Sequence, residues 1–139
     1  MENMHNPTAF PMLEVLQLPP KPRKNCMLLM SEVGIPLRAT EDLIEIAAPI
    51  IDYAKITDHA GLVDRLSAAW IKKKVALYNA NGIDVLPGGI PFQLAVIQHK
   101  VDDYLKAVRD LGFAGVEMSE DTMAPMETGS AGSSIWRGS

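Results

Sequence analysis

Four short apolar runs, separated by segments with helical signals, constrain the fold of this chain more than any other feature. The runs are "CMLLM" (26–30), "IIDYAKI" (50–56), "IDVL" (83–86) and "FAGVEM" (113–118). Short continuous apolar runs are typical of strands that are buried on both faces of a sheet. Strands that alternate with helices favour a parallel sheet with right-handed crossovers. We therefore predict an α/β fold, a (β/α) repeat with parallel strands in the order β-α-β-α-β-α-β.

Three segments between these runs are predicted as helices. Thr40 is the expected N-cap of "EDLIEIAA", which follows it directly. The segment 61–82 is a helix that ends at Asn81-Gly82, with "IKKKV" on its solvent-exposed side. The segment 91–112 is expected to form one helix, with Pro91 in its first turn and Gly112 as its stop signal.

The two ends of the chain lack this pattern, and the length fits one domain. Residues 1–24 carry five prolines and are predicted as an extended arm that ends in the basic run "KPRK". Residues 122–139 are rich in Gly and Ser and are expected to form a flexible tail. Residues 25–121 are then the folded domain, which is long enough to bury a core.

Composition excludes several classes of function. The net charge of −4 argues against a nucleic-acid surface. Cys26 is the only cysteine, so no intrachain disulfide and no Cys-based zinc site is expected, and a reducing, cytoplasmic setting fits. No apolar run approaches the roughly 20 residues that a membrane-spanning helix needs, and the first residues lack the pattern of a secretory signal.

Polar groups gather where the predicted strands end. Ligands of parallel α/β folds bind beyond the carboxyl ends of the strands. The groups expected at that edge are Glu32 after the first strand, Lys55, Asp58 and His59 at the second, Gly88 and Gly89 after the third, and Glu117, Ser119 and Glu120 at the fourth. Lys55 is the natural partner of Glu117 or Glu32, because a charge inside a fold needs a partner.

Each of these groups has a structural alternative to a functional role. Gly88-Gly89 either turns the chain from strand to helix or clears space for a ligand. An ion pair of Lys55 can be purely structural. His59 is either an exposed loop residue or, like Asp58, a group that moves a proton. Arg23 in "KPRK" belongs either to a solvated basic run or to a phosphate contact.

Four motifs in order resemble the phosphosulfolactate synthase family over about residues 18–121. They are "KPRKNCMLLMSEVGIPL", similar to the arm, strand and Asp-x-Gly turn of that family; "EDLIEIAAPIIDYAKI", similar to its second strand; "LYNANGIDVLPGGIPFQLA", similar to its GI-x-V-x-PGGT-x-FE; and "YLKAVRDLGFAGVEMSE", similar to its LGF-x-x-VEISDG. The resemblance implies a TIM (β/α)₈ barrel, of which this chain would form the first half.

The resemblance also implies a lyase of coenzyme M biosynthesis. Such an enzyme adds sulfite, or a related nucleophile, to phosphoenolpyruvate or a similar small anionic acid with Mg²⁺ as cofactor. For such an enzyme we expect catalytic roles for Lys55, Glu117 and His59, substrate binding by Gly88, Gly89, Ser119 and Arg23, and Mg²⁺ binding by Glu32 and Glu120. The resemblance itself carries over Lys55, Gly88, Gly89, Glu117 and Ser119 by position, with Glu32 where the family has Asp.

Departures from the family pattern favour two further hypotheses. The loop after Lys55 reads "TDHAG" where the family has a "GWGTS"-like loop, and Glu120-Asp121 add negative charge beside the expected anion site. In the first hypothesis, the chain is a binding or assembly module without catalysis. In the second, two copies pair into a homo-oligomer with a ligand site at the seam, because a half-barrel leaves open sheet edges.

Overall fold

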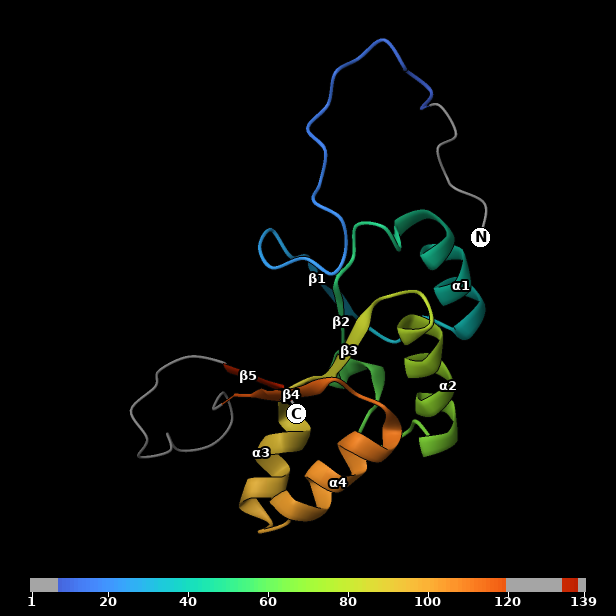
Figure 1. Ribbon diagram of the computed structural model, residues 1–139. Coiled ribbons are helices and arrows are strands. Elements are labelled where there is room, and N and C mark those ends of the chain that lie inside the picture. Colours follow the sequence, from blue (N-terminus) through green and yellow to red (C-terminus); the bar gives the residue numbers. More distant parts are fainter. Residues whose placement is uncertain (1–7, 120–133, 138–139) are drawn as a thin grey trace.

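The structure, a computed structural model, describes residues 8–119 and 134–137. Its elements are β1 (Leu29–Glu32), α1 (Leu37–Ala47), β2 (Tyr53–Ile56), the 3₁₀ turn η1 (Asp58–Ala60), α2 (Ala68–Asn79), β3 (Asp84–Pro87), α3 (Ile90–Ile97), α4 (Val101–Leu111), β4 (Gly115–Met118) and β5 (Ser134–Arg137). The predicted alternation of strands and helices is confirmed, and the chain is a partial β/α barrel (Figure 1).

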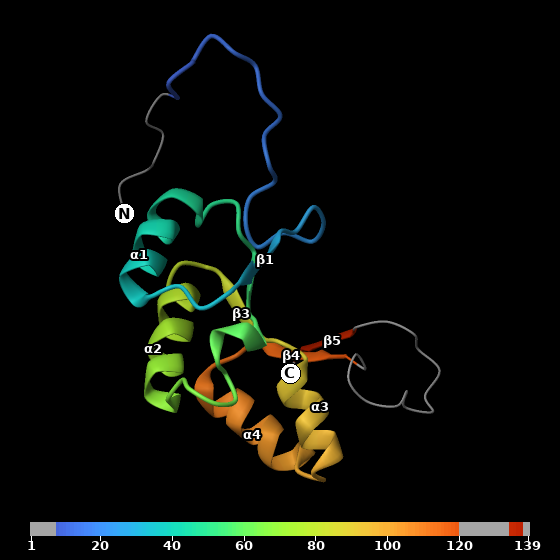
Figure 2. The ribbon, with the colours of Figure 1, turned by 180° about the vertical axis from the view of Figure 1, so that it is seen from behind.

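The first three strands form a parallel sheet in the order β1-β2-β3. Ala54 and Ile56 of β2 point to the face covered by helices and are buried with Ile71 and Val75 of α2. Burying one Ile or Val side chain of this kind stabilises the fold by about 1.5–3 kcal/mol. Figure 2 shows α1 and α2 side by side against this face. The core therefore lies between sheet and helices, and the opposite face, which in a barrel is the interior, carries the intervening side chains.

The fourth strand lies beside β3 but outside the three-stranded ladder. The Ala114 N–H donates to the Val85 carbonyl at 2.9 Å, and farther along both segments Ser119 packs against Gly89. Because these contacts occur in the same order along both segments, β4 runs in the same direction as β3. β4 also pairs antiparallel with β5. Residues 134–137 of the predicted flexible tail thus form a strand, and residues 122–133, 138 and 139 lie outside the described residues.

Three predicted helix boundaries are wrong. The helix predicted over 61–82 begins only at Ala68, with Ser67 as its N-cap. Thr40 is not an N-cap, because α1 begins at Leu37 after Pro36, whose φ of −61° suits a helix start, and the Thr40 hydroxyl donates to the Pro36 carbonyl inside the first turn. The single helix predicted over 91–112 is two helices, since His99 adopts a φ of +56° that a right-handed helix cannot contain. No helix within residues 8–119 is long and apolar enough to cross a membrane.

The "KPRK" run attaches the arm to the folded domain. Residues 8–18 extend away from the body (Figure 1) and expose apolar side chains. Lys21 then donates to the carbonyls of Ala48 at 2.7 Å and Gly82 at 3.1 Å. Arg23 pairs with Asp52. Lys21 and Arg23 are therefore anchors and do not belong to a solvated basic run.

Candidate functional site

The candidate site lies at the carboxyl ends of β2, β3 and β4. Lys55 comes from β2, and Asp58 follows that strand in η1. Gly88 and Gly89 connect β3 to α3, and Glu117 comes from the end of β4. The structure therefore brings together groups from three successive β/α units, as expected from the direction of the strands.

The Lys55–Glu117 ion pair is the centre of this site. Lys55 Nζ lies 3.3 Å from Glu117 Oε1 and 3.2 Å from Oε2, and the two side chains are 24% and 16% exposed. Lys55 is in register with Leu86 of β3, on the face opposite the helix-covered Ala54 and Ile56. Water reaches both partners, so the separation of this pair costs less than that of a buried pair. An anionic ligand can therefore compete with Glu117 for the Lys55 ammonium.

The glycine pair allows two side chains to approach the end of β3. A Cβ on Gly88 would lie 2.7 Å from Asp58 Oδ2, and a Cβ on Gly89 would overlap Ser119 Oγ. Gly89 has a φ of −78°, which any residue adopts. Glycine is therefore required at Gly89 because side chains approach it closely, and not because of its backbone conformation.

Ser119 joins the end of β4 to α3. Its side chain is buried, and its hydroxyl oxygen accepts a hydrogen bond from Gln93 Nε2 at 2.5 Å. Gln93 is itself fully buried on α3. Ser119 therefore borders the site with its oxygen already bound, and its contact with Gly89 fixes the distance between β4 and the start of α3.

Asp58 is a second carboxyl group at the site, and it is half-buried. The backbone N–H groups of Ile90 and of Asp58 itself hydrogen-bond to its carboxylate, while Oδ1 is buried without a hydrogen-bond partner in the described part of the chain. Burial raises the pKa of Asp58 above its ordinary value of 3.8, and the nearby charge of Glu117 raises this pKa further. Between the two loop residues that could move a proton, the structure thus favours Asp58.

His59 is exposed to solvent beside this cluster. Its carbonyl accepts a hydrogen bond from Arg65 Nη2 at 3.1 Å. The sequence placed His59 at the correct edge of the sheet because it follows β2. Within the 3₁₀ turn, however, Asp58 is half-buried and His59 is exposed.

Glu32, expected as a metal ligand, lies on the other face of the sheet. It is in register with Ile56, one residue beyond Lys55, so strand alternation directs it under the helices. Glu32 Oε2 lies 2.7 Å from Lys74 Nζ, and the two side chains are 1% and 0% exposed. Glu32 Oε1 accepts the N–H groups of Gly34 and Ile35, each at 2.6 Å. The prediction that "IKKKV" faces solvent is therefore wrong for Lys74, although Lys72 and Lys73 are exposed.

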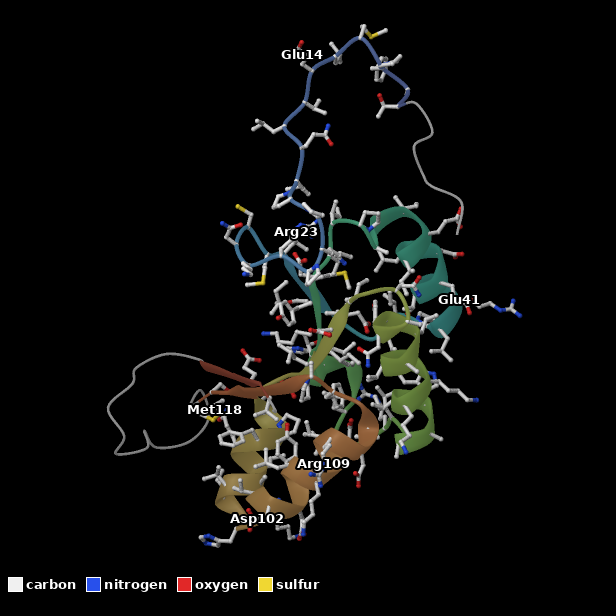
Figure 3. The ribbon with its side chains drawn as sticks, viewed as in Figure 1. Glu14, Arg23, Glu41, Asp102, Arg109 and Met118 are labelled. Carbon is white, nitrogen blue, oxygen red and sulfur yellow. The ribbon has the colours of Figure 1, made fainter. Side chains whose placement is uncertain are left out.

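Arg23, expected to bind substrate, lies at the amino ends of the strands. Its Nη1 is 2.8 Å from Asp52 Oδ1, just before β2, and its other donors bind the carbonyls of Pro19 and Pro49. Figure 3 shows Arg23 where the arm meets the body, apart from Met118 at the end of β4. The structure does not bring Arg23 to the candidate site.

The described residues do not assemble the donors expected for Mg²⁺. No group of three His, Cys, Asp or Glu side chains that could hold a metal is present among them. Glu32 is neutralised by Lys74 and Glu117 by Lys55. Glu120, the other expected ligand, lies outside the described residues. The described side chains therefore do not fit the cofactor that the resemblance implied.

Comparisons with known proteins match most of the chain. The family model of (2R)-phospho-3-sulfolactate synthase (ComA) matches residues 17–131. The phosphosulfolactate synthase of Methanothermobacter thermautotrophicus is 31% identical over 103 residues, which are 74% of this chain and 39% of that protein. The phosphosulfolactate synthase of Methanocaldococcus jannaschii is 30% identical over 95 residues, which are 68% of this chain and 37% of that protein. The aligned part of the chain thus spans about two fifths of the length of these relatives.

Proposed function

The chain belongs to the phosphosulfolactate synthase family, and from that premise we propose that it supplies the Lys55 and Glu117 part of a lyase site. The reaction is the addition of sulfite, or a related nucleophile, to phosphoenolpyruvate or a similar small anionic acid. The observation that supports this proposal is the partly exposed Lys55–Glu117 pair on the inner face of the sheet.

Lys55 has the chemistry to stabilise the charge that such an addition creates. The sulfur of hydrogensulfite bonds to the terminal carbon of the enol, and the π electron pair moves to the phosphate-bearing carbon and its carboxylate. The hydrogensulfite proton ends on that carbon. An ammonium group fixed beside the substrate carboxylate stabilises the transition state more than the bound substrate, because negative charge grows there during the addition. Once Lys55 turns to the substrate, Glu117 is free to relay the proton.

The phosphate group of the substrate needs further partners. Phosphate sites of β/α barrels are commonly built from loops after the seventh and eighth strands. The described residues form five strands, and Lys55 is the cation that these strands bring to the site. In this proposal, groups other than those described hold the phosphate, either with or without Mg²⁺.

Binding and chemistry can be tested separately. We expect phosphoenolpyruvate to raise the melting temperature of the protein, since a ligand at 100 times its Kd stabilises by about 2.7 kcal/mol. With sulfite added, proton NMR should show loss of the vinyl signals; Mg²⁺ is included in one of two parallel samples. Lys55→Ala should abolish the thermal shift, whereas Lys72→Ala, at an exposed position, should keep it. No shift and no loss of vinyl signals in either sample would overturn the proposal.

A second candidate function is that of an assembly module. β1 pairs with β2 on one side, and no other described strand pairs with it; Leu28 and Leu29 are 43% and 40% exposed there. Unprotected apolar edge strands favour association with another chain. We also propose that two copies associate through β1, because β4 already has β5 as a partner. Light scattering should then report a dimer, and a monomer at high concentration would contradict it.

We propose a reducing, cytoplasmic setting for the protein. Cys26 is free and exposed, and exposed free thiols are typical of proteins in reducing compartments. A tagged chain should therefore be recovered in the cytosolic fraction of lysed cells. Recovery from the membrane or the medium would contradict this location.

A further inference from the structure

The carboxylate of Asp58 lies at the start of α3, where a ligand anion could otherwise bind. Asp58 Oδ2 is 2.7 Å from the position that a Cβ on Gly88 would take. The N–H of Ile90, the first residue of α3, hydrogen-bonds to the same carboxylate. Free N–H groups and the helix dipole attract anions to the start of a helix. A side chain of the protein itself thus satisfies this attraction.

The surroundings of Asp58 compensate its negative charge only in part. Glu117 of β4 adds a second negative charge nearby, and the cation Lys55 is paired with Glu117. From α4, the hydroxyl of Tyr104 is buried without a hydrogen-bond partner in the described residues, and its pKa is raised by burial and by the charge of Asp58. His59 in η1 slightly favours the ionised form of Asp58. Oδ1 of Asp58 is itself left without a partner among the same residues. The N–H groups thus hold the carboxylate in a place that penalises its charge.

We infer that Asp58 determines specificity by filling the anion position at the start of α3. A phosphate or sulfonate group is excluded from that position while Asp58 is ionised. The substrate must then lie with its anionic groups turned away from α3 and toward Lys55. This orientation of the substrate rests on the proposed function, whereas the occupation of the anion position by Asp58 does not.

The test monitors the Ile90 amide by ¹⁵N NMR while inorganic sulfate is added at pH 7.5. In Asp58→Ala we expect a saturable shift of this amide, with an apparent Kd about tenfold lower than in the wild type, the size expected for removing one repelling charge from a half-buried position. Asp58→Asn keeps the size of the side chain and removes its charge, so its response should lie between the two. Asp64→Ala removes an exposed carboxylate next to Arg65 and should behave as the wild type.

Lowering the pH provides a second arm without mutation. Sulfate keeps its double charge in mild acid, so any gain in its binding reports the protein. The wild-type Ile90 amide should respond to sulfate more strongly as Asp58 takes up a proton, and the gain should be clearly smaller in Asp58→Ala, which keeps only the carboxylate of Glu117 nearby. Equal responses of wild type and Asp58→Ala, or no response of the Ile90 amide in either, would overturn the inference. Absence of phosphoenolpyruvate turnover in the wild type would count against the proposed function alone.

Discussion

Lys74 Nζ on α2 lies 2.7 Å from Glu32 Oε2 at the end of β1, and both side chains are almost completely buried. Lys74 also donates to the Ile35 carbonyl and lies 4.9 Å from the centre of the Trp70 ring. Burial lowers the pKa of Lys74, and Glu32 opposes that shift. The pair therefore joins α2 to the turn after β1 on the helix-covered face of the sheet. It does not contribute to the candidate site, which lies on the opposite, inner face.

Removing one member of this pair should destabilise the protein strongly. Lys74→Met leaves the Glu32 carboxylate buried without its cation, which typically costs about 3–5 kcal/mol in unfolding free energy. Urea denaturation followed by circular dichroism measures this cost. Lys73→Met, one residue away and exposed, should change stability by less than about 0.5 kcal/mol.

The double variant Glu32→Gln/Lys74→Met distinguishes a buried charge from lost packing, because the Gln side-chain oxygen can still accept the N–H groups of Gly34 and Ile35. It removes both charges together, so it should recover most of the stability lost in Lys74→Met. A double variant as unstable as the sum of the two single variants would show that the charges are not coupled.

Glu117→Gln should strengthen binding of an anion to Lys55. In the wild type the ligand must displace the Glu117 carboxylate from Lys55 Nζ, 3.2 Å away. Because the pair is only partly buried, its loss should destabilise the fold less than loss of the fully buried Lys74–Glu32 pair. Calorimetric titration with phosphoenolpyruvate should therefore show affinity rising several-fold, with little change in melting temperature. Glu41→Gln, on the exposed side of α1, is the control; weaker binding by Glu117→Gln would instead mean that Glu117 contacts the ligand productively.

Asp58→Asn should change the pH dependence of stability in a defined direction. Burial raises the folded-state pKa of Asp58 above 3.8, so the native state binds more protons than the unfolded state over the window above 3.8. The contribution of Asp58 to stability is thus fully present below that value and is lost as the pH rises. The stability of Asp58→Asn relative to the wild type should therefore increase from pH 3.5 to pH 7. A difference between the two proteins that does not vary with pH would contradict the raised pKa.

The sequence allowed the strand order and the centre of the site to be predicted. Continuous apolar runs marked β1 to β4, and the direction of parallel strands placed Lys55, Gly88-Gly89 and Glu117 at one edge. The Lys55–Glu117 pair was one of two expected alternatives, and the structure confirms it. These features depend on periodicity and connectivity, which are local properties of a sequence.

The features that the sequence did not reveal depend on register and on single backbone conformations. Counting residues after the first apolar run placed Glu32 at the edge, and the pairing of Glu32 with Ile56 shows that it occupies the helix-covered face. The left-handed conformation of His99 interrupts a segment of good helical periodicity, without a glycine to mark the break. Arg23 pairs with Asp52, which lies 29 residues farther along the sequence, so no local pattern indicated this ion pair. Successive side chains of a strand point to opposite faces, so Met30 and Glu32 share a face. The apolar Met30, which packs against the core, was therefore the signal in the sequence that Glu32 is also buried.

Gly89→Ala should destabilise the protein more than Gly88→Ala. The new Cβ would overlap Ser119 Oγ and lie 2.8 Å from Ser119 Cβ, in a buried contact held by Gln93. Overpacking of this kind costs about 1–3 kcal/mol. At Gly88 the closest atom is the end of the half-buried Asp58 side chain, which can move away. Thermal denaturation measures both, and Gly89→Ala/Ser119→Ala should recover part of the loss because the nearest atom is gone. Equal stability of the wild type and Gly89→Ala would show that the close approach of β4 to α3 is wrong.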